Sequence, residues 1–190
     1  MVKDILQIGH PILTQKTRTV TDFEDSVVRE TIVNLLDTCI ANKSISAGLA
    51  APQIGSDLSI CVVRRTDLED SRSKKIADDQ LWKVLINPTI SGQSDSFSEI
   101  WEACLSIGTG RDRLYGPVSR PAEVEISFAD EQGNRRTIAG EGFFSHLLQH
   151  EIDHLNGKLF ISYISNPSNL WRSADLDNYL AENDQYPIIK

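Results

Sequence analysis

Cysteine is scarce in this chain, and the three that occur, Cys39, Cys61 and Cys104, have no repeating spacing. An odd number of thiols without a pattern argues against a disulfide framework, so a reducing compartment is the simpler expectation. Long apolar runs are missing as well: the first residues lack the apolar core of a secretory signal, and no run is long enough to cross a bilayer. We therefore expect a soluble protein of the cytoplasm, or of an organelle after removal of a transit peptide, with no membrane partner.

Positive charge is also in short supply, because 19 Lys and Arg face 27 Asp and Glu, for a formal net charge of −8 at pH 7. The basic residues between Arg64 and Lys75 alternate with acids, which is typical of a solvated loop. Without a compensating basic stripe, no nucleic-acid surface is expected. What remains is an ordinary globular composition, 40% hydrophobic and 24% charged, in 190 residues, which suits one domain with appended segments.

The order of the predicted elements favours an α+β fold. Apolar spacing predicts a helix at about 25–41, capped by Thr21 or Asp22. A second, largely apolar helix opens at Glu141, and its apolar circumference predicts a central position. Strands are predicted at 59–65, 83–88, 98–106, 123–128, 135–139 and 159–161, with loops at 66–80 and 108–121 and a short helix at 173–181. We therefore expect small mixed or antiparallel sheets packed around a central buried helix.

The second helix carries the most informative motif, because residues 149–154 read Gln-His-Glu-Ile-Asp-His and contain H-E-x-x-H. Residues four apart share a helix face, so His150 and His154 can coordinate one metal ion from the same side. Glu151 is then placed to act on a water molecule beside that ion. Two histidines leave a tetrahedral site one protein ligand short.

The third ligand is not decided by these residues alone. Cys104 follows a predicted strand and precedes a loop, from which its side chain can reach an adjacent helix, but Cys61 stays open as an alternative. A zincin-type peptidase would instead find its third ligand downstream of the helix. The polar tail offers carboxylates there without any motif: Asp175, Asp177 and Glu182.

Three segments taken together resemble the peptide deformylase family. Residues 46–53 resemble its G-x-G-x-A-A-x-Q pattern, residues 102–106 resemble E-G-C-L-S, and residues 149–154 match Q-H-E-x-D-H without a substitution. The resemblance runs from about residue 5 to 165. It implies a catalytic domain at 1–165, with 166–190 as a C-terminal extension packed on the same domain or trailing from it.

The resemblance implies hydrolytic removal of the N-formyl group from the formylmethionine that starts newly made polypeptides, with release of formate. The expected partner is the formylated peptide or nascent chain, at the ribosome. The metal, Fe(II) natively with Zn(II) or Ni(II) as substitutes, would be held by Cys104, His150 and His154, with water as fourth ligand. Glu151 would act as acid and base, and the Gln53 amide and the Leu105 backbone N–H would face the oxyanion.

The resemblance also assigns a substrate cleft. Gly48 would pair with the substrate backbone, and Arg111, or Arg113 as an alternative, would lie near the peptide. The methionine pocket would be lined by Ala47, Ile100, Phe143, His146 and Leu147. Ser46 and Ala103 stand where the family has glycine, and each would cost about 1 kcal/mol if its φ had to be positive. These two side chains in the cleft keep open a divergent protein that binds formylated or N-terminal peptides with low or altered activity.

Overall fold

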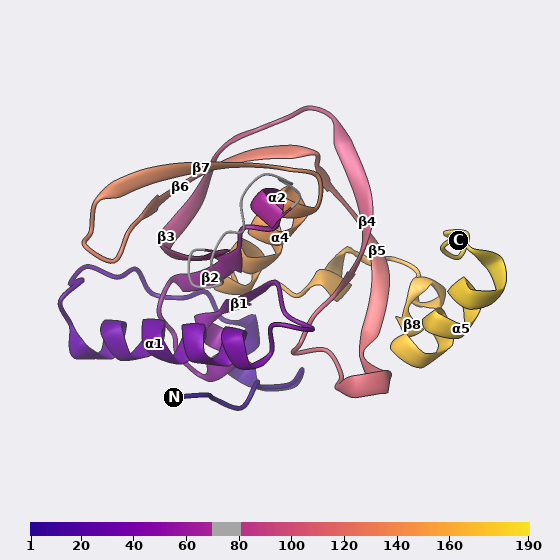
Figure 1. The fold of residues 1–190 in the computed structure, drawn as a ribbon, viewed down its shortest axis with the longest axis horizontal. Helices are drawn as coiled ribbons and strands as arrows, with labels where there is room; N and C mark the ends of the chain where they lie inside the picture. The colour runs from indigo at the N-terminus through magenta and orange to yellow at the C-terminus, as the bar shows by residue number, and fades with distance from the viewer. Residues whose placement is uncertain (70–80) are drawn as a thin grey trace.

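The computed structural model describes residues 1–69 and 81–190, and these residues form two antiparallel sheets with helices between and beside them (Figure 1). The five-stranded sheet has the order β1 (Gly48–Ala50), β2 (Ile60–Arg64), β3 (Trp82–Gln93), β6 (Glu123–Ala129) and β7 (Arg135–Glu141). The three-stranded sheet has the order β4 (Phe97–Ala103), β5 (Leu114–Pro121) and β8 (Trp171–Arg172). The helices are α1 (Ser26–Ala41), α2 (Thr66–Glu69), α4 (Gly142–Leu155) and α5 (Ser173–Asn183). The predicted α+β class with antiparallel sheets is confirmed.

Helix α1 forms because its apolar residues recur on one stripe. Val28, Ile32, Leu35 and Cys39 are buried and pack against the five-stranded sheet, as their spacing predicts. Its N-cap is Asp25, whose Oδ1 accepts a hydrogen bond from the Val27 N–H at 2.8 Å. The prediction of Thr21 or Asp22 as the cap was wrong: both precede the helix, and the Asp22 carboxylate accepts from the Glu24 N–H instead.

Helix α4 contacts both sheets and carries residues 149–154. Phe144, Leu148 and Ile152 pack into a cluster with side chains of β2, β3 and β6. On the other side, the Ser145 hydroxyl and the Gln149 amide donate to the Pro121 carbonyl of β5, at 3.0 and 3.1 Å. Because one helix bridges the two sheets, its inward residues meet strands from both.

Two predictions about segments that contain proline were wrong. Strand β3 does not stop at Pro88, because a bulge between Ile86 and Thr89 absorbs the proline while Asn87, at φ +51°, bonds both backbone groups of Val20. Residues 114–121 form β5 rather than a loop. Its prolines are tolerated because β8 pairs only with Leu114 and Tyr115, which leaves that edge free at Pro117.

The apolar run at 159–161 does not form a strand, because residues Phe160–Tyr163 make a 3₁₀ helix that buries Phe160 against Leu13 and Val118. The predicted loop at 66–80 begins as helix α2, and 70–80 lie outside the described residues. The helix predicted at 173–181 is confirmed as α5. None of the helices in the described part of the chain has the length and apolar character needed to span a bilayer.

Candidate active site

A cavity of about 210 Å³ lies where the two sheets and α4 meet. Strand β1 is an edge of the five-stranded sheet, and β4 is an edge of the three-stranded sheet. Residues beside or within these two strands line the cavity together with α4, among them Gly48, Ala103 and Glu151. A cleft between two sheet edges can accept an extended peptide, because edge strands offer backbone groups for pairing.

Three potential metal ligands meet at the inner end of this cavity. One ligand atom each from Cys104, His150 and His154 lie within 4.8 Å of one another, and the Cys104 Sγ is 3.2 Å from the His154 Nε2. Helix α4 supplies both imidazoles from one face, and the chain supplies the thiol as it leaves β4. Cys61, the alternative from the sequence, is buried instead in the core beneath the five-stranded sheet. One thiolate with two imidazoles suits a tetrahedral catalytic ion such as Zn(II) or Fe(II).

The surroundings of the Cys104 side chain favour the thiolate, the form that binds metal. Burial by itself would raise the pKa of Cys104, but the positive charge of His154 and hydrogen bonds from both imidazoles outweigh it and hold the pKa well below its ordinary value. The Ser106 N–H and the Gln53 amide also donate to this sulfur, at 3.4 and 3.5 Å.

Glu102 organises the side chains around the three potential metal ligands, called the triad below. Its carboxylate accepts two bonds from Arg120, at 2.6 and 3.0 Å, and faces the Nδ1 atoms of His146 and His150, each at 3.0 Å. Burial alone would raise the pKa of Glu102, but these hydrogen bonds hold it well below its usual range. Because an ionised carboxylate only accepts, Glu102 keeps a proton on the His150 Nδ1, so Nε2 is the nitrogen that would give up its proton to a metal.

Glu102 and Arg120 were not identified as functional residues from the sequence. The position of Glu102, two residues before Cys104, could have indicated its role, because side chains two apart on a strand point to the same face. If Cys104 faces the motif helix, then Glu102 faces it too. Arg120 gave no comparable signal, since its partners Glu102 and Asp153 come from distant segments.

Glu151 is buried, and its Oε2 has no hydrogen-bond partner among the described residues. Burial raises the pKa of Glu151 to about 7, with the positive charges of His150 and His154 opposing and the negative charge of Cys104 adding to it. A carboxyl group with a pKa near neutrality exchanges protons readily at physiological pH. Gly48 packs against this carboxyl group so closely that a Cβ there would lie 2.5 Å from the Glu151 Oε1. A side chain at position 48 would therefore have to displace the Glu151 carboxyl group.

The orientation of the Gln53 amide is fixed by the turn that follows β1. The Ala50 N–H donates to the Gln53 Oε1 at 2.9 Å, so the amide nitrogen faces the triad and donates to the Ser106 Oγ at 3.1 Å. Leu105, directly after Cys104, also lines the cavity, and its carbonyl accepts from the Gln7 amide at 2.9 Å.

The structure places most of the predicted pocket residues on the cavity wall, namely Ser46, Ala47, Gly48, Ala103, Phe143, His146 and Leu147. Ile100 and Arg111 are not on that wall. Ile100 is half-buried and pairs with Val118, whereas Arg111 is exposed on a 3₁₀ turn. Arg113, the alternative, does line the cavity, because it directly precedes β5.

The two positions that replace glycine carry no backbone strain. The non-glycine residues with positive φ among those described are Asn87 and Asp184, so Ser46 and Ala103 have ordinary backbone conformations. The Ser46 hydroxyl donates to the Gly48 carbonyl at 2.9 Å, which adds a bond beside β1 rather than a clash.

The model of the family described as "Polypeptide deformylase" matches residues 2–169. A peptide deformylase of Prochlorococcus marinus (strain AS9601) is 33% identical over 88% of this chain and 76% of its own length, and one of Brucella suis is 35% identical over 86% and 85%. A solved peptide deformylase of Synechococcus elongatus in complex with actinonin superposes with a TM-score of 0.72 at 30% identity, covering 98% of this chain and 87% of that one. The chain belongs to the peptide deformylase family of metal-dependent hydrolases.

Proposed function

We propose that this enzyme hydrolyses the formamide bond of N-formylmethionyl polypeptides with the residues that converge on the cavity. Water adds to the formyl carbon, the carbon–nitrogen bond breaks, and the products are formate and a free α-amine. The observation that carries the proposal is that Glu151 and Gln53 line the same cavity as Cys104 and His150, with the ligand atom of His154 within 4.8 Å of theirs.

Cys104, His150 and His154 would hold one divalent ion, for which Fe(II) is our expectation and Zn(II) or Ni(II) are substitutes. When bound, such an ion supplies Lewis-acid polarisation and makes water acidic enough to attack at neutral pH. The donor set fits this role, since the thiolate is stabilised by its neighbours and Glu102 fixes the His150 tautomer.

Glu151 takes the proton from the attacking water and passes it to the departing amine nitrogen. Its raised pKa suits both transfers, because the group must accept a proton and then release it near neutral pH. The Gln53 amide and the Leu105 N–H donate hydrogen bonds to the formyl oxygen as negative charge develops on it. The bond from Ala50 keeps the Gln53 amide oriented before the substrate arrives.

The methionine side chain would enter the pocket formed by Ala47, Phe143, His146 and Leu147, while the substrate backbone pairs with the free edge of β1 at Gly48. The formyl group marks the first residue made, so we place the reaction on nascent chains as they leave the ribosome. That substrate implies action in the cytoplasm, or in an organelle with its own ribosomes if a transit peptide has been removed.

The test is formate release from a formyl-Met tripeptide by enzyme loaded anaerobically with Fe(II). We expect turnover by the native chain and a loss of about 10²- to 10⁴-fold in kcat for Glu151→Gln, at unchanged metal content. Glu131→Gln, an exposed carboxylate at the β6–β7 turn, is the matched control and should be fully active. Formate release by the native chain no faster than by Glu151→Gln would overturn the proposal.

A further inference from the structure

The C-terminal segment 171–190 lies beyond residue 169, where the family match ends, yet it contacts the wall of the cleft. We infer that this segment positions the outer wall, through Trp101, Arg113 and Tyr115, and thereby sets the affinity for peptide residues that follow the formylated one. The inference rests on the proposed function, because it concerns the other end of the same substrate.

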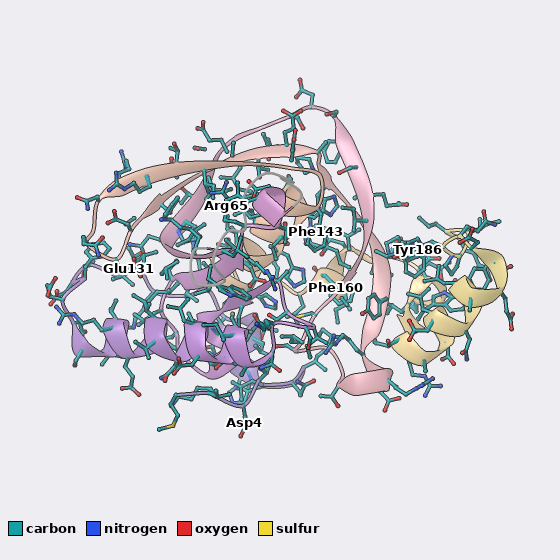
Figure 2. The ribbon with its side chains drawn as sticks, in the orientation of Figure 1. Asp4, Arg65, Glu131, Phe143, Phe160 and Tyr186 are labelled. Atoms are coloured by element: carbon teal, nitrogen blue, oxygen red, sulfur yellow. The ribbon has the colours of Figure 1, made fainter. Side chains whose placement is uncertain are left out.

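The segment contacts the three outer wall residues in three different ways. The ring of Tyr186 stacks on Trp101, with centroids 5.2 Å apart and planes 19° apart. Trp171 of β8 pairs with Tyr115 of β5, and the Ser173 N–H donates to the Arg113 carbonyl at 2.8 Å. All three wall residues line the cavity. Figure 2 shows Tyr186 between α5 and the β4–β5 strands, so the tail approaches the cleft from outside.

Tyr186 is itself held in place from both sides along the chain. Before it, α5 buries Leu176, and Tyr179 packs edge-to-face on Trp171 with centroids 5.2 Å apart. After it, the Lys190 N–H donates to the Asn169 side chain at 3.0 Å, and the same side chain donates back to the Lys190 carbonyl at 3.2 Å. The stack on Trp101 is therefore part of an ordered element rather than a contact made by a loose end.

The position of Trp101 indicates which part of a peptide it would meet. It precedes the metal ligand Cys104 by three residues on an extended strand, or roughly 10 Å at about 3.3 Å per residue. An extended peptide advances by the same amount per residue, so its second or third residue past the formyl end would lie beside Trp101. A stacked aromatic pair offers a flat apolar surface with little freedom to lose. The favoured partner is a formyl peptide with an apolar or aromatic side chain at that distance.

The test compares two substrates on the full-length enzyme: formyl-Met amide, which ends at the first residue, and formyl-Met-Ala-Phe. For Tyr186→Ala we expect the KM of the tripeptide to rise about two- to tenfold, the range set by one aromatic pair, at unchanged kcat. The KM of formyl-Met amide should change less than twofold. Tyr186→Phe, which keeps the ring, should restore the native KM. Ile188→Ala, exposed two residues further on, should behave as native.

Binding is also measured without turnover, by titrating formyl-Met-Ala-Phe into Glu151→Gln with and without Tyr186→Ala. A matching rise in Kd supports the inference. An equal change for both substrates indicates general loosening of the site and overturns it, as does no change for either. If the native enzyme releases no formate, the proposed function fails, while the Kd comparison still decides whether the tail shapes the cleft.

Discussion

The two ends of the cleft are built in opposite ways. At the inner end, Cys104 and Glu151 are 3% exposed and His154 1% exposed, and polar partners hold the side chains of Cys104 and His150. At the outer end, Tyr186 is 52% exposed, and the wall is held by its ring contact with Trp101 and by backbone bonds. The inner end is assembled from α4, β4 and the turn after β1, whereas the outer end depends on the C-terminal segment.

This difference separates two tasks. Buried groups with several partners keep one geometry, which transition-state stabilisation requires. Exposed apolar surfaces contribute to binding but tolerate variation in what they contact. Changes at the inner end should therefore lower kcat or metal affinity, and changes at the outer end should raise KM. The following predictions test this division in order of decreasing effect.

The largest effect is expected from Gly48→Ala. The new Cβ would lie 2.5 Å from the Glu151 Oε1 and would force the carboxyl group out of position. Because a displacement of about 1 Å can cost on the order of 100-fold in rate, kcat should fall by about that factor or more. Gly92→Ala is the matched control, since its Cβ would meet only the Glu125 Cβ, at an ordinary 3.6 Å. A Gly48→Ala enzyme with native kcat would show that the inner end is less rigid than its packing implies.

The next effect concerns metal retention in Glu102→Gln. A neutral amide cannot accept hydrogen bonds from Arg120, His146 and His150 together, so the orientation of His150 is lost. The metal affinity should therefore fall about 10- to 100-fold. The measurement is competition with a chelator, followed by metal analysis. The melting temperature should fall as well, because Arg120 loses the more buried of its two carboxylate partners. Glu99→Gln, exposed on the same strand, should retain its metal, and equal metal loss in both variants would contradict the assignment.

The sequence predicted the inner end far better than the outer end. His150, Glu151 and His154 lie within about one turn of one helix, and Cys104 and Gln53 lie in short segments that resemble motifs of the family. Arg120 could not be predicted, because its role depends on two carboxylates brought together only by the fold. The contact of Tyr186 with Trp101 could not be predicted either, because no sequence pattern around an exposed aromatic residue indicates its partner. The class of the fold followed from apolar spacing, whereas β5 was missed because its prolines and glycine are typical of loops.

A moderate effect is expected from pH. Burial raises the pKa of Glu151 to about 7, so the carboxylate that serves as base is present above that pH and is lost as the pH falls through it. The positive charge of a bound ion favours the carboxylate and moves the midpoint to or below 7. Below the midpoint, kcat/KM should fall about tenfold per pH unit. Titration of Cys104 should not change kcat/KM further in this range, because its pKa is held well below the ordinary value. A kcat/KM that stays constant from pH 5 to 8 would contradict the assignment of Glu151 as the base.

The smallest effect is expected at His146 on the pocket wall. This residue contacts both the buried Glu102 and the methionine pocket, so it could serve either catalysis or binding. Its Nδ1 faces the ionised Glu102, so Nδ1 carries the proton and Nε2 accepts from the Ser98 hydroxyl at 3.0 Å. With both nitrogens occupied, this polar residue presents a wall that a thioether side chain can contact. Ser98→Ala leaves Nε2 as an unpaired buried acceptor, which penalises an apolar occupant and favours a hydrogen-bond donor.

For Ser98→Ala we therefore expect selectivity for formyl-Met over formyl-Gln tripeptides, taken as the ratio of kcat/KM, to fall about two- to fivefold. The kcat for formyl-Met should stay native, because Glu102 and the triad keep their other partners. Ser119→Ala, exposed on β5, is the control and should leave selectivity unchanged. A change in selectivity at constant kcat would show that one buried residue of the inner end governs binding rather than rate. A fall in kcat instead would mean that His146 acts through Glu102 on the triad, and the inner end would then serve catalysis alone.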